Sequence, residues 1–329
     1  MWREPVFEDI EAAARRLAGR IHHTPLLRHP FLDQASGAQV LLKAEPLQRT
    51  GSFKIRGALN CLLAAAERGE LPSRVIAYSS GNHAQAVAAA AASLGLPATI
   101  VMPADAPAIK RRLTARQGAE IVLYDRHRES REAIAQGVRE RLGGMIIPPF
   151  DHPDVIAGQG TLGLEIARDT RDAPPEIALV PAGGGGLIAG TALALRTAFP
   201  TLAVYAVEPE GADDTARSLA AGQRLANDPL PQGICDALFA PMPGELTFAL
   251  NRRLLAGGLT VSEEEVLRAM RFAFDHLKIV IEPGGAVALA AVLARRLPLA
   301  GRRVVVVASG GNVDPALFSR ALNEGEERE

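Results

Sequence analysis

The sequence has 329 residues, of which 48% are hydrophobic and 22% are charged, and its formal net charge is −1 at pH 7. This length and composition indicate a globular protein of about two domains. The near-neutral charge, without a basic stripe, argues against nucleic acid as a partner, and the sequence offers no secretory signal or membrane span. We expect a cytoplasmic protein that acts on a small molecule.

Cysteine and histidine are too scattered to predict a metal or redox centre. Cys61 and Cys235 fit no such spacing, and we expect both to be free thiols. Six histidines are not spaced as metal ligands and are interpreted as structural: His22, His23, His29, His127, His152 and His276.

Strands and helices alternate along most of the sequence. The pattern predicts, in chain order, helix 8–20, strand 40–43, helix 52–67, strand 75–78, helix 83–94, strand 98–102, helix 107–117, strand 120–124, helix 130–142, strand 145–147, helix 160–170, strand 177–180, helix 187–199, strand 202–207, helix 263–274 and strand 304–307. Repeated strand–helix units predict an α/β fold with parallel sheets and helices on both faces. Ligands of such sheets bind at the carboxyl ends of the strands, so the loops there carry the most information.

The first unusual loop, Thr50-Gly51-Ser52-Phe53-Lys54, places a lysine at the start of a helix. The helix dipole disfavours a cation at that place, so we expect the pKa of the Lys54 amine to be lowered. A neutral amine is the form that makes a Schiff base with a carbonyl compound. A solvated surface lysine is the alternative interpretation.

The second loop contains four consecutive glycines, Gly183, Gly184, Gly185 and Gly186, between a strand and a helix. A tight turn needs only one or two glycines. Four of them leave the backbone N–H groups free to surround an anion at the helix N-terminus, so the loop predicts a phosphate site.

Two further loops follow strands in the same way. Ser79-Ser80-Gly81-Asn82-His83 could hold a carboxylate at a helix N-terminus, although a simple helix cap is the alternative. Ser309-Gly310-Gly311-Asn312 follows the apolar strand 304–308 and presents a hydroxyl at the strand end.

The glycine loop also allows a different class of enzyme. Gly184, Gly186 and Ala189 match the G-x-G-x-x-A fingerprint of dinucleotide-binding folds, and Glu208 ends the next strand, where an NAD-binding carboxylate would lie. An NAD-dependent dehydrogenase would, however, leave Lys54 and the two serine loops without a role.

Taken together, the four loops and the segment Val155–Thr161 resemble fold-type II pyridoxal 5′-phosphate (PLP) enzymes of the serine/threonine dehydratase and serine racemase family. The resemblance runs from about Thr24 to Asp314. It implies a fold like the tryptophan synthase β subunit, with two open, twisted, mostly parallel sheets. It also implies a large PLP-binding domain formed by 1–73 and 151–329, a small α/β domain at 74–150, and a homodimer or homotetramer.

The resemblance assigns a role to each matching residue. It makes Lys54 the Schiff-base lysine and the base at the substrate Cα, and it sets Phe53 against the cofactor ring. The residues implied to bind the cofactor are Phe53, Lys54, Asn82, Gly183, Gly184, Gly185, Gly186, Leu187 and Ser309, the last at the pyridine nitrogen. Those implied to bind the substrate carboxylate are Ser79, Gly81, Asn82 and His83.

Three features are typical of the racemase and hydroxyaspartate ammonia-lyase branch. Ser80 stands where threonine dehydratases usually carry alanine, and its hydroxyl could act as an acid or base on the face opposite the lysine. Arg131 matches an arginine that could pair with a substrate carboxylate. Glu208, Ala212 and Asp214 match a site for a divalent cation (Mg²⁺, Ca²⁺ or Mn²⁺), whereas a solvated acidic loop is the alternative. No regulatory domain is expected after the catalytic part.

We therefore expect a PLP-dependent ammonia-lyase that converts a β-hydroxy amino acid (serine, threonine or 3-hydroxyaspartate) to a 2-oxo acid and ammonia. Racemisation could be a side activity or the main one. The dehydrogenase and a binding homologue without activity are the alternatives from other classes.

Overall fold

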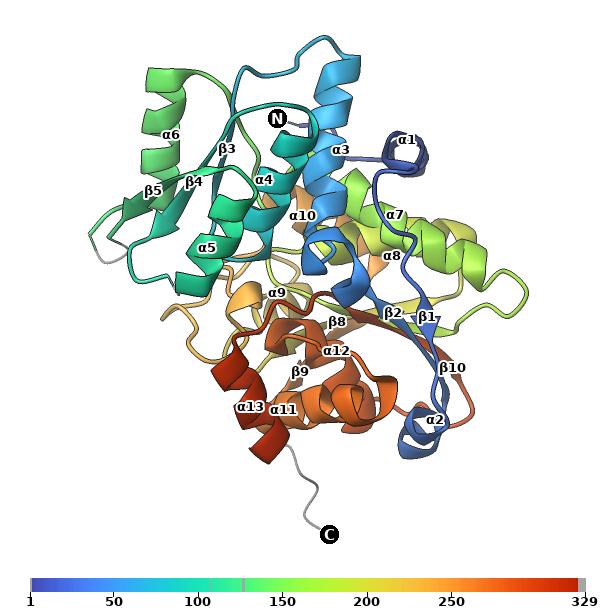
Figure 1. Ribbon diagram of the computed structural model, residues 1–329. Helices are drawn as coiled ribbons and strands as arrows, with labels where there is room; N and C mark the ends of the chain where they lie inside the picture. The colour runs from blue at the N-terminus through green and yellow to red at the C-terminus, as the bar shows by residue number, and fades with distance from the viewer. Residues whose placement is uncertain (1, 107, 126–127, 325–329) are drawn as a thin grey trace.

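The computed structural model describes residues 2–106, 108–125 and 128–324. His127 and the first residue of the helix predicted from Pro107 lie outside these ranges. The strands form two separate sheets, and Figure 1 shows them in different parts of the molecule, each flanked by helices. Apart from the antiparallel pair β1–β2, all strand pairs within the sheets are parallel. This arrangement confirms the predicted α/β class.

The smaller sheet has the strand order β5-β4-β3-β6. Its members are β3 (Val75–Tyr78), β4 (Ala98–Pro103), β5 (Glu120–Tyr124) and β6 (Met145–Ile146). Side chains of β3 alternate between the faces, since Val75 and Ala77 pack with α3 (Lys54–Glu67) and α4 (Asn82–Ser93), whereas Ile76 packs with α6 (Arg131–Leu142). Helices therefore cover both faces.

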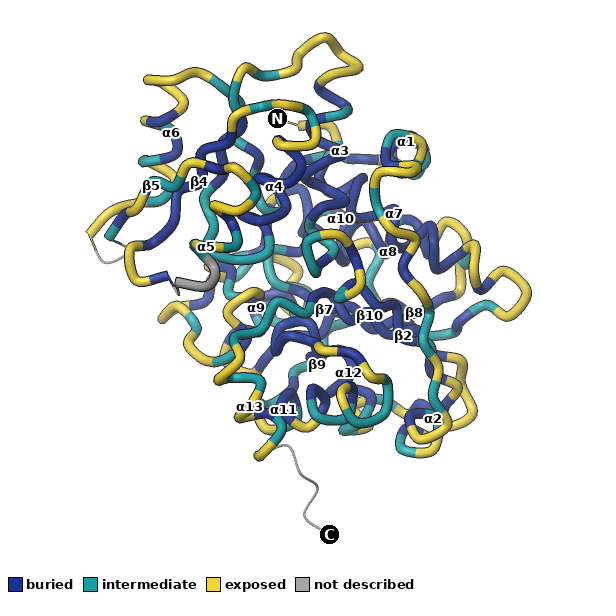
Figure 2. Tube along the Cα trace, viewed as in Figure 1, coloured by how far each residue is buried: buried dark blue, intermediate teal, exposed yellow. Residues whose placement is uncertain are grey.

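The larger sheet has the strand order β1-β2-β10-β7-β8-β9. Its members are β1 (Leu26–Leu27), β2 (Gln39–Ala44), β7 (Ile177–Pro181), β8 (Ala203–Pro209), β9 (Gly257–Val261) and β10 (Arg303–Ala308). One face packs on α7 (Pro153–Asp169) and α8 (Gly186–Ala198). The other face packs on α2 (Pro30–Ser36), α11 (Glu263–Phe272) and α12 (Pro283–Leu293). Most residues of the central strands are buried, whereas the edge strands β5 and β9 are partly exposed (Figure 2).

The remaining elements connect or flank these layers. They are α1 (Phe7–Leu17), α5 (Ala108–Arg116), α9 (Asp214–Ala221), α10 (Glu245–Leu254), α13 (Pro315–Glu324), three short 3₁₀ turns at Glu45–Leu47, Arg49–Gly51 and Asp236–Leu238, and a π-helical turn at Ala273–Leu277. In the part of the chain that the structure describes, no helix combines the length and the apolar character needed to cross a bilayer.

Several elements differ from the sequence-based expectation. The helix expected from residue 160 begins at Pro153, where the imidazole of His152 accepts the N–H of Asp154 and caps it. Helices α2, α9, α10, α12 and α13 and strand β9 were not predicted. Helix α3, expected in the large domain, also packs into the core of the smaller sheet.

A buried network of charged side chains fixes the start of α3. Arg56 donates to both carboxylate oxygens of Glu45 at 2.8 Å and to Glu165 at 2.6 and 2.9 Å. Lys43 donates to Glu165 and to the carbonyl oxygen of Thr24, both at 2.6 Å. Two positive charges balance two negative ones, and each charge has a partner, as buried ions require. The network joins α3 to β2 and α7.

Candidate active site

A cavity of about 200 Å³ lies at the carboxyl ends of β3, β7 and β10. This is the place where ligands bind in open parallel sheets. It brings together segments that are far apart in the sequence, including all four loops singled out above. The predicted site residues that line it are Phe53, Lys54, Ser79, Ser80, Gly81, Asn82, His83, Arg131, Gly183, Gly184, Gly185, Gly186, Leu187 and Ser309.

Lys54 is the first residue of α3 and extends its amine into this cavity. The Nζ atom donates a hydrogen bond of 2.7 Å to the carbonyl oxygen of Pro149. Burial lowers the pKa of the amine to about 8, while the nearby Glu282 carboxylate acts in the opposite direction. The direction agrees with the expectation from the sequence, but the dominant cause is burial, which the helix position alone did not reveal. About half of the amine is therefore neutral at about pH 8, and the neutral form is the one that acts as a nucleophile.

The glycine loop leads from β7 into α8, which begins at Gly186. Gly185 has a φ of +89°, a left-handed conformation that glycine adopts without strain. A Cβ atom on Gly184 would lie 2.2 Å from the ring of Phe150, so this residue must also be glycine. The first N–H groups of α8 have no partner within the helix, and Gly186 and Leu187, with which the helix starts, line the cavity. The loop has the form of an anion site.

The serine loop leads from β3 into α4, which begins at Asn82. The amide of Asn82 donates to Glu282 Oε1 at 2.5 Å and accepts from Asn312 at 2.8 Å. His83 is buried, and its Nε2 atom donates to the carbonyl oxygen of Ile147 at 2.9 Å. Burial, followed by the charge of Lys54, lowers the pKa of His83 to about 3, so the imidazole is neutral. This contact occupies the Nε2 atom of the ring.

Sequence reasoning missed several polar residues of the cavity, of which Glu282 is the most informative. It lies at the N-terminus of α12. Its carboxylate accepts a hydrogen bond from Asn82 and raises the pKa of Lys54. Asp236 and Tyr78 also line the cavity. The segment Glu282-Pro283-Gly284-Gly285 carried a signal, since a carboxylate before Pro-Gly-Gly resembles a helix start.

Arg131 is the first residue of α6 and directly follows Ser130, which caps the helix. Its guanidinium carbon lies 5.5 Å from the centre of the Tyr78 ring, and its Nε atom donates to Glu132 at 2.8 Å. Among the described residues that line the cavity, it is the only arginine. A second negative group on a ligand would therefore find its guanidinium partner here.

The predicted cation residues form a separate cluster at the end of β8, the strand that pairs with β7. Glu208, Ala212 and Asp214 are buried, which contradicts the alternative of a solvated loop. Both oxygens of Glu208 accept backbone N–H groups of α9, at 2.9 and 2.8 Å. Asp214 accepts from Asn227 through Oδ1 at 2.7 Å, while its buried Oδ2 has no partner among the described residues.

Burial acts against the charged forms of both carboxylates in this cluster. Burial and the neighbouring Asp214 raise the pKa of Glu208 to about 8, and burial raises that of Asp214 to about 6. Two buried carboxylates and an unpaired carboxylate oxygen fit a hard divalent cation with oxygen ligands.

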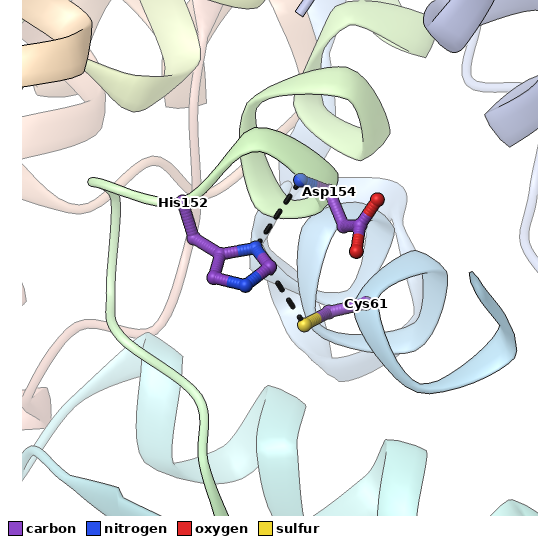
Figure 3. Close-up of side chains that lie close together, drawn as sticks. All are labelled: Cys61, His152 and Asp154. Carbon is purple, nitrogen blue, oxygen red and sulfur yellow. Dashed lines mark hydrogen bonds between the residues drawn. The ribbon is translucent and has the colours of Figure 1, made fainter. Parts of the chain in front are cut away.

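Cys61, His152 and Asp154 converge beside α3 and α7, as Figure 3 shows. Each of them already has a structural role. The Nδ1 atom of His152 accepts the backbone N–H of Asp154 at 3.2 Å and lies 3.9 Å from the sulfur of Cys61. The carboxylate of Asp154 pairs with Arg68 at 3.1 Å, and burial raises the pKa of the Cys61 thiol. His152 acts as a helix cap, in agreement with its interpretation as a structural histidine, and both cysteines are free.

Comparison with known proteins identifies the family of this fold and site. Residues 17–310 match the family model described as pyridoxal-phosphate dependent enzyme. The chain is 44% identical to an L-threo-3-hydroxyaspartate ammonia-lyase from Pseudomonas sp, over 96% of this chain and 98% of the relative. It is 46% identical to a solved threonine deaminase from T.th., with a TM-score of 0.88, over 94% of this chain and 99% of that one.

Maize serine racemase is a further solved relative, with 35% identity, a TM-score of 0.91 and coverage of 98% of both chains. The matched region includes the glycine loop. Glu208, which the dehydrogenase alternative needs at a ribose, is instead buried and hydrogen-bonded to α9. The chain belongs to the pyridoxal-phosphate dependent enzyme family.

Proposed function

We propose that the protein is an ammonia-lyase that converts a β-hydroxy amino acid with a second carboxylate, of the 3-hydroxyaspartate class, to a 2-oxo acid and ammonia. The observation that carries this proposal is the convergence of Lys54, Ser80, Arg131 and the glycine loop in one cavity. The resemblance to the Pseudomonas sp ammonia-lyase supports the same substrate class.

The residues of the cavity fit PLP. The N–H groups of the glycine loop and Leu187, at the start of α8, would hold the phosphate. Phe53 would lie against the ring, Asn82 would contact its oxygen substituent, and Ser309 would face the pyridine nitrogen. A hydroxyl does not keep a proton on that nitrogen as a carboxylate would, which favours prompt loss of a β-leaving group.

When bound, PLP supplies an electron sink for the negative charge left at the substrate Cα. Lys54 would hold the cofactor through its Nζ atom, and the same atom, when it is free, would accept the proton from the substrate Cα. The N–H groups of Ser79–His83 hold the α-carboxylate at the start of α4. Loss of the β-hydroxyl as water gives an enamine, whose hydrolysis takes up one water and releases the 2-oxo acid and ammonia.

Arg131 gives the substrate its second binding point. Arg131 lines the cavity, and a carboxylate on the substrate Cβ could pair with its guanidinium group in bidentate fashion. Serine and threonine carry no such group, so they would bind without this contact.

Racemisation is the second candidate function, and Ser80 is the observation that favours it. Its hydroxyl lines the same cavity as Lys54 at the N-terminus of α4. A proton donor on the face opposite Lys54 would allow the Cα carbanion to be reprotonated with inverted configuration.

The cluster of Glu208, Ala212 and Asp214 is proposed to bind a divalent cation such as Mg²⁺, Ca²⁺ or Mn²⁺. The unpaired Oδ2 of Asp214 and the raised pKa of both carboxylates support this assignment. The Ala212 carbonyl would complete the protein ligands. The cation would stabilise the end of β8, next to the strand that carries the glycine loop.

The division into domains, the oligomeric state and the location in the cell are proposals as well. The smaller sheet falls within residues 74–150 and the larger one outside them, which supports a division into a small domain and a large domain with PLP between them. We propose a cytoplasmic homodimer or homotetramer, which light scattering would measure as a multiple of the 34.7 kDa chain.

A substrate panel tests the proposed function. The purified protein is incubated with each stereoisomer of serine, threonine and 3-hydroxyaspartate, and 2-oxo acid and ammonia are measured. We expect equimolar products, and a kcat/KM for one 3-hydroxyaspartate isomer roughly ten- to a hundredfold above that for serine, the scale of a charged hydrogen bond. Absence of ammonia from every compound would refute the lyase, and preference for serine or threonine would refute the substrate class.

A further inference from the structure

Helix α10 lies against the glycine loop on the side away from the cavity lining described above. Thr247 and Asn251 stand one turn apart on this helix, and both are fully buried. The hydroxyl of Thr247 donates a hydrogen bond of 2.7 Å to the carbonyl oxygen of Gly184. A Cβ atom on Gly185 would lie 2.9 Å from the Nδ2 atom of Asn251 and 3.0 Å from the Thr247 hydroxyl. The two side chains therefore touch the two central glycines.

Asn251 is unusual because both polar atoms of its amide are buried without a hydrogen-bond partner among the described residues. A buried amide in this state is costly, and native proteins rarely keep one unless another group or an ordered water satisfies it. The nearest feature of the site is the left-handed Gly185. The amide is thus placed to pair with the loop backbone, directly or through one water, when the loop takes its ligand-bound arrangement.

Helix α10 is itself held firmly in this position. The Asp151 carboxylate accepts the first three N–H groups of the helix, at 3.0, 3.0 and 3.1 Å. Asp151 follows Phe150, whose ring packs against Gly184, and Pro149, whose carbonyl accepts the amine of Lys54. The loop is clamped between Phe150 on one side and α10 on the other.

We propose that Thr247 and Asn251 are positioning residues that hold the glycine loop in its phosphate-binding form. They act through Gly184 and Gly185, and neither side chain lines the cavity. This inference rests on the proposed function only in that the loop binds the phosphate of PLP. It adds that part of the affinity for the cofactor comes from Thr247 and Asn251, which contact the loop from outside the cavity.

The test compares binding of PLP by full-length variants, measured as the dissociation constant from fluorescence titration and as the ³¹P NMR signal of the bound phosphate. Thr247→Val and Asn251→Leu should each weaken PLP binding by roughly three- to tenfold, the scale of one lost neutral hydrogen bond. Thr247→Ser keeps the hydroxyl and should restore the affinity. At saturating PLP, kcat should stay within about threefold of the wild type, since neither residue touches the reacting atoms.

A matched control separates positioning from general stability. Thr170 is a buried threonine that donates to a carbonyl oxygen at 2.8 Å, far from the loop, at the end of α7. Thr170→Val should lower the melting temperature and leave PLP affinity unchanged. Asn251→Leu should show the reverse pattern, because it removes an unpaired buried amide: its PLP-free form should melt no lower than the wild type.

Failure of the positioning role and failure of the proposed function give different results. Unchanged PLP affinity and an unchanged ³¹P signal in both α10 variants would overturn the positioning role. If Asn251→Leu does not fold, the pair Thr247→Val and Thr247→Ser decides the question alone. Failure of the wild type to bind PLP at all would instead refute the proposed function on which the inference rests.

Discussion

The Nζ atom of Lys54 donates a hydrogen bond of 2.7 Å to the carbonyl oxygen of Pro149. Pro149 directly precedes Phe150, whose ring fills the space beside Gly184. One short segment therefore links the reactive amine to the predicted phosphate loop. Because one short segment makes both contacts, the fold itself sets the distance between the amine and the loop.

The first prediction concerns the amine of Lys54. Because burial lowers its pKa to about 8, the rate at which PLP-free protein takes up PLP should rise with pH and reach half its maximum near pH 8. Glu282 raises the pKa of this amine, so Glu282→Gln should move the midpoint to lower pH. Stopped-flow absorbance at a series of pH values measures this. A midpoint at about pH 10.4, the ordinary pKa of lysine, would contradict the burial argument.

The second prediction concerns the cation site. The pKa values of Glu208 and Asp214 are raised to about 8 and about 6, so their protonated forms stabilise the cation-free fold. That stabilisation is complete below about pH 4 and is lost as the pH rises through these two values. The melting temperature without cation should fall over this range, and the increase caused by Mg²⁺, Ca²⁺ or Mn²⁺ should grow with pH.

Two variants test the same site. Asp214→Asn should abolish the response to cations, because it removes the negative charge of the carboxylate whose Oδ2 is unpaired. Asp213→Asn is the matched control, since Asp213 is a partly exposed neighbour that pairs with Arg217 at 2.9 Å. Equal loss of the response in both variants, or a wild type indifferent to chelator, would refute the site.

The third prediction concerns substrate selection. Arg131→Gln should lower kcat/KM for 3-hydroxyaspartate by roughly ten- to a hundredfold, the scale of a charged hydrogen bond, and leave turnover of serine nearly unchanged. Arg128→Gln removes an exposed arginine nearby and serves as the control. The ratio of the two kcat/KM values is the measured quantity. A proportional loss with both substrates would mean that Arg131 stabilises the fold of α6 and does not select the substrate.

The fourth prediction concerns Ser80. Lys54 reaches one face of the substrate Cα, so elimination from the L-substrate should survive largely intact in Ser80→Ala. Racemisation and turnover of D-substrates should drop by roughly a hundredfold or more, the scale of a lost general acid or base. Chiral chromatography beside 2-oxo acid assays measures both activities in the same samples. Loss of both to the same degree would assign Ser80 to substrate binding.

The parts of the site that could be predicted are those formed by residues that follow one another in the sequence. Lys54 with its flanking residues and the four glycines each report on a local backbone form, which a sequence displays directly. Glu282 was not predicted, because its role depends on contacts with Asn82 and Lys54 from distant segments. For the same reason the convergence of Cys61 with His152 could not be foreseen.

In the fold, too, the elements that were missed depend on contacts between segments that are far apart in the sequence. Helix α10 has no cap of its own at Gly244, and its first turn is satisfied by Asp151, which lies in another segment. Helix α12 is buried all round and therefore shows no amphipathic period. The early start of α7 was obscured by Gly158 and Gly160, which weaken a helix but allow close contact with Arg56 and Gly190.

Attachment of the cofactor to one particular lysine is the central claim, and mass spectrometry after borohydride reduction tests it most directly. The purified, yellow protein is reduced and digested, and its peptides are mapped. We expect a single reduced PLP adduct on Lys54, and in Lys54→Ala we expect no adduct and a loss of activity of at least about three orders of magnitude. Lys278→Asn, a change at an exposed lysine on the surface, should retain both the adduct and the activity. A wild type without an adduct, or with the adduct on another lysine, would contradict the account.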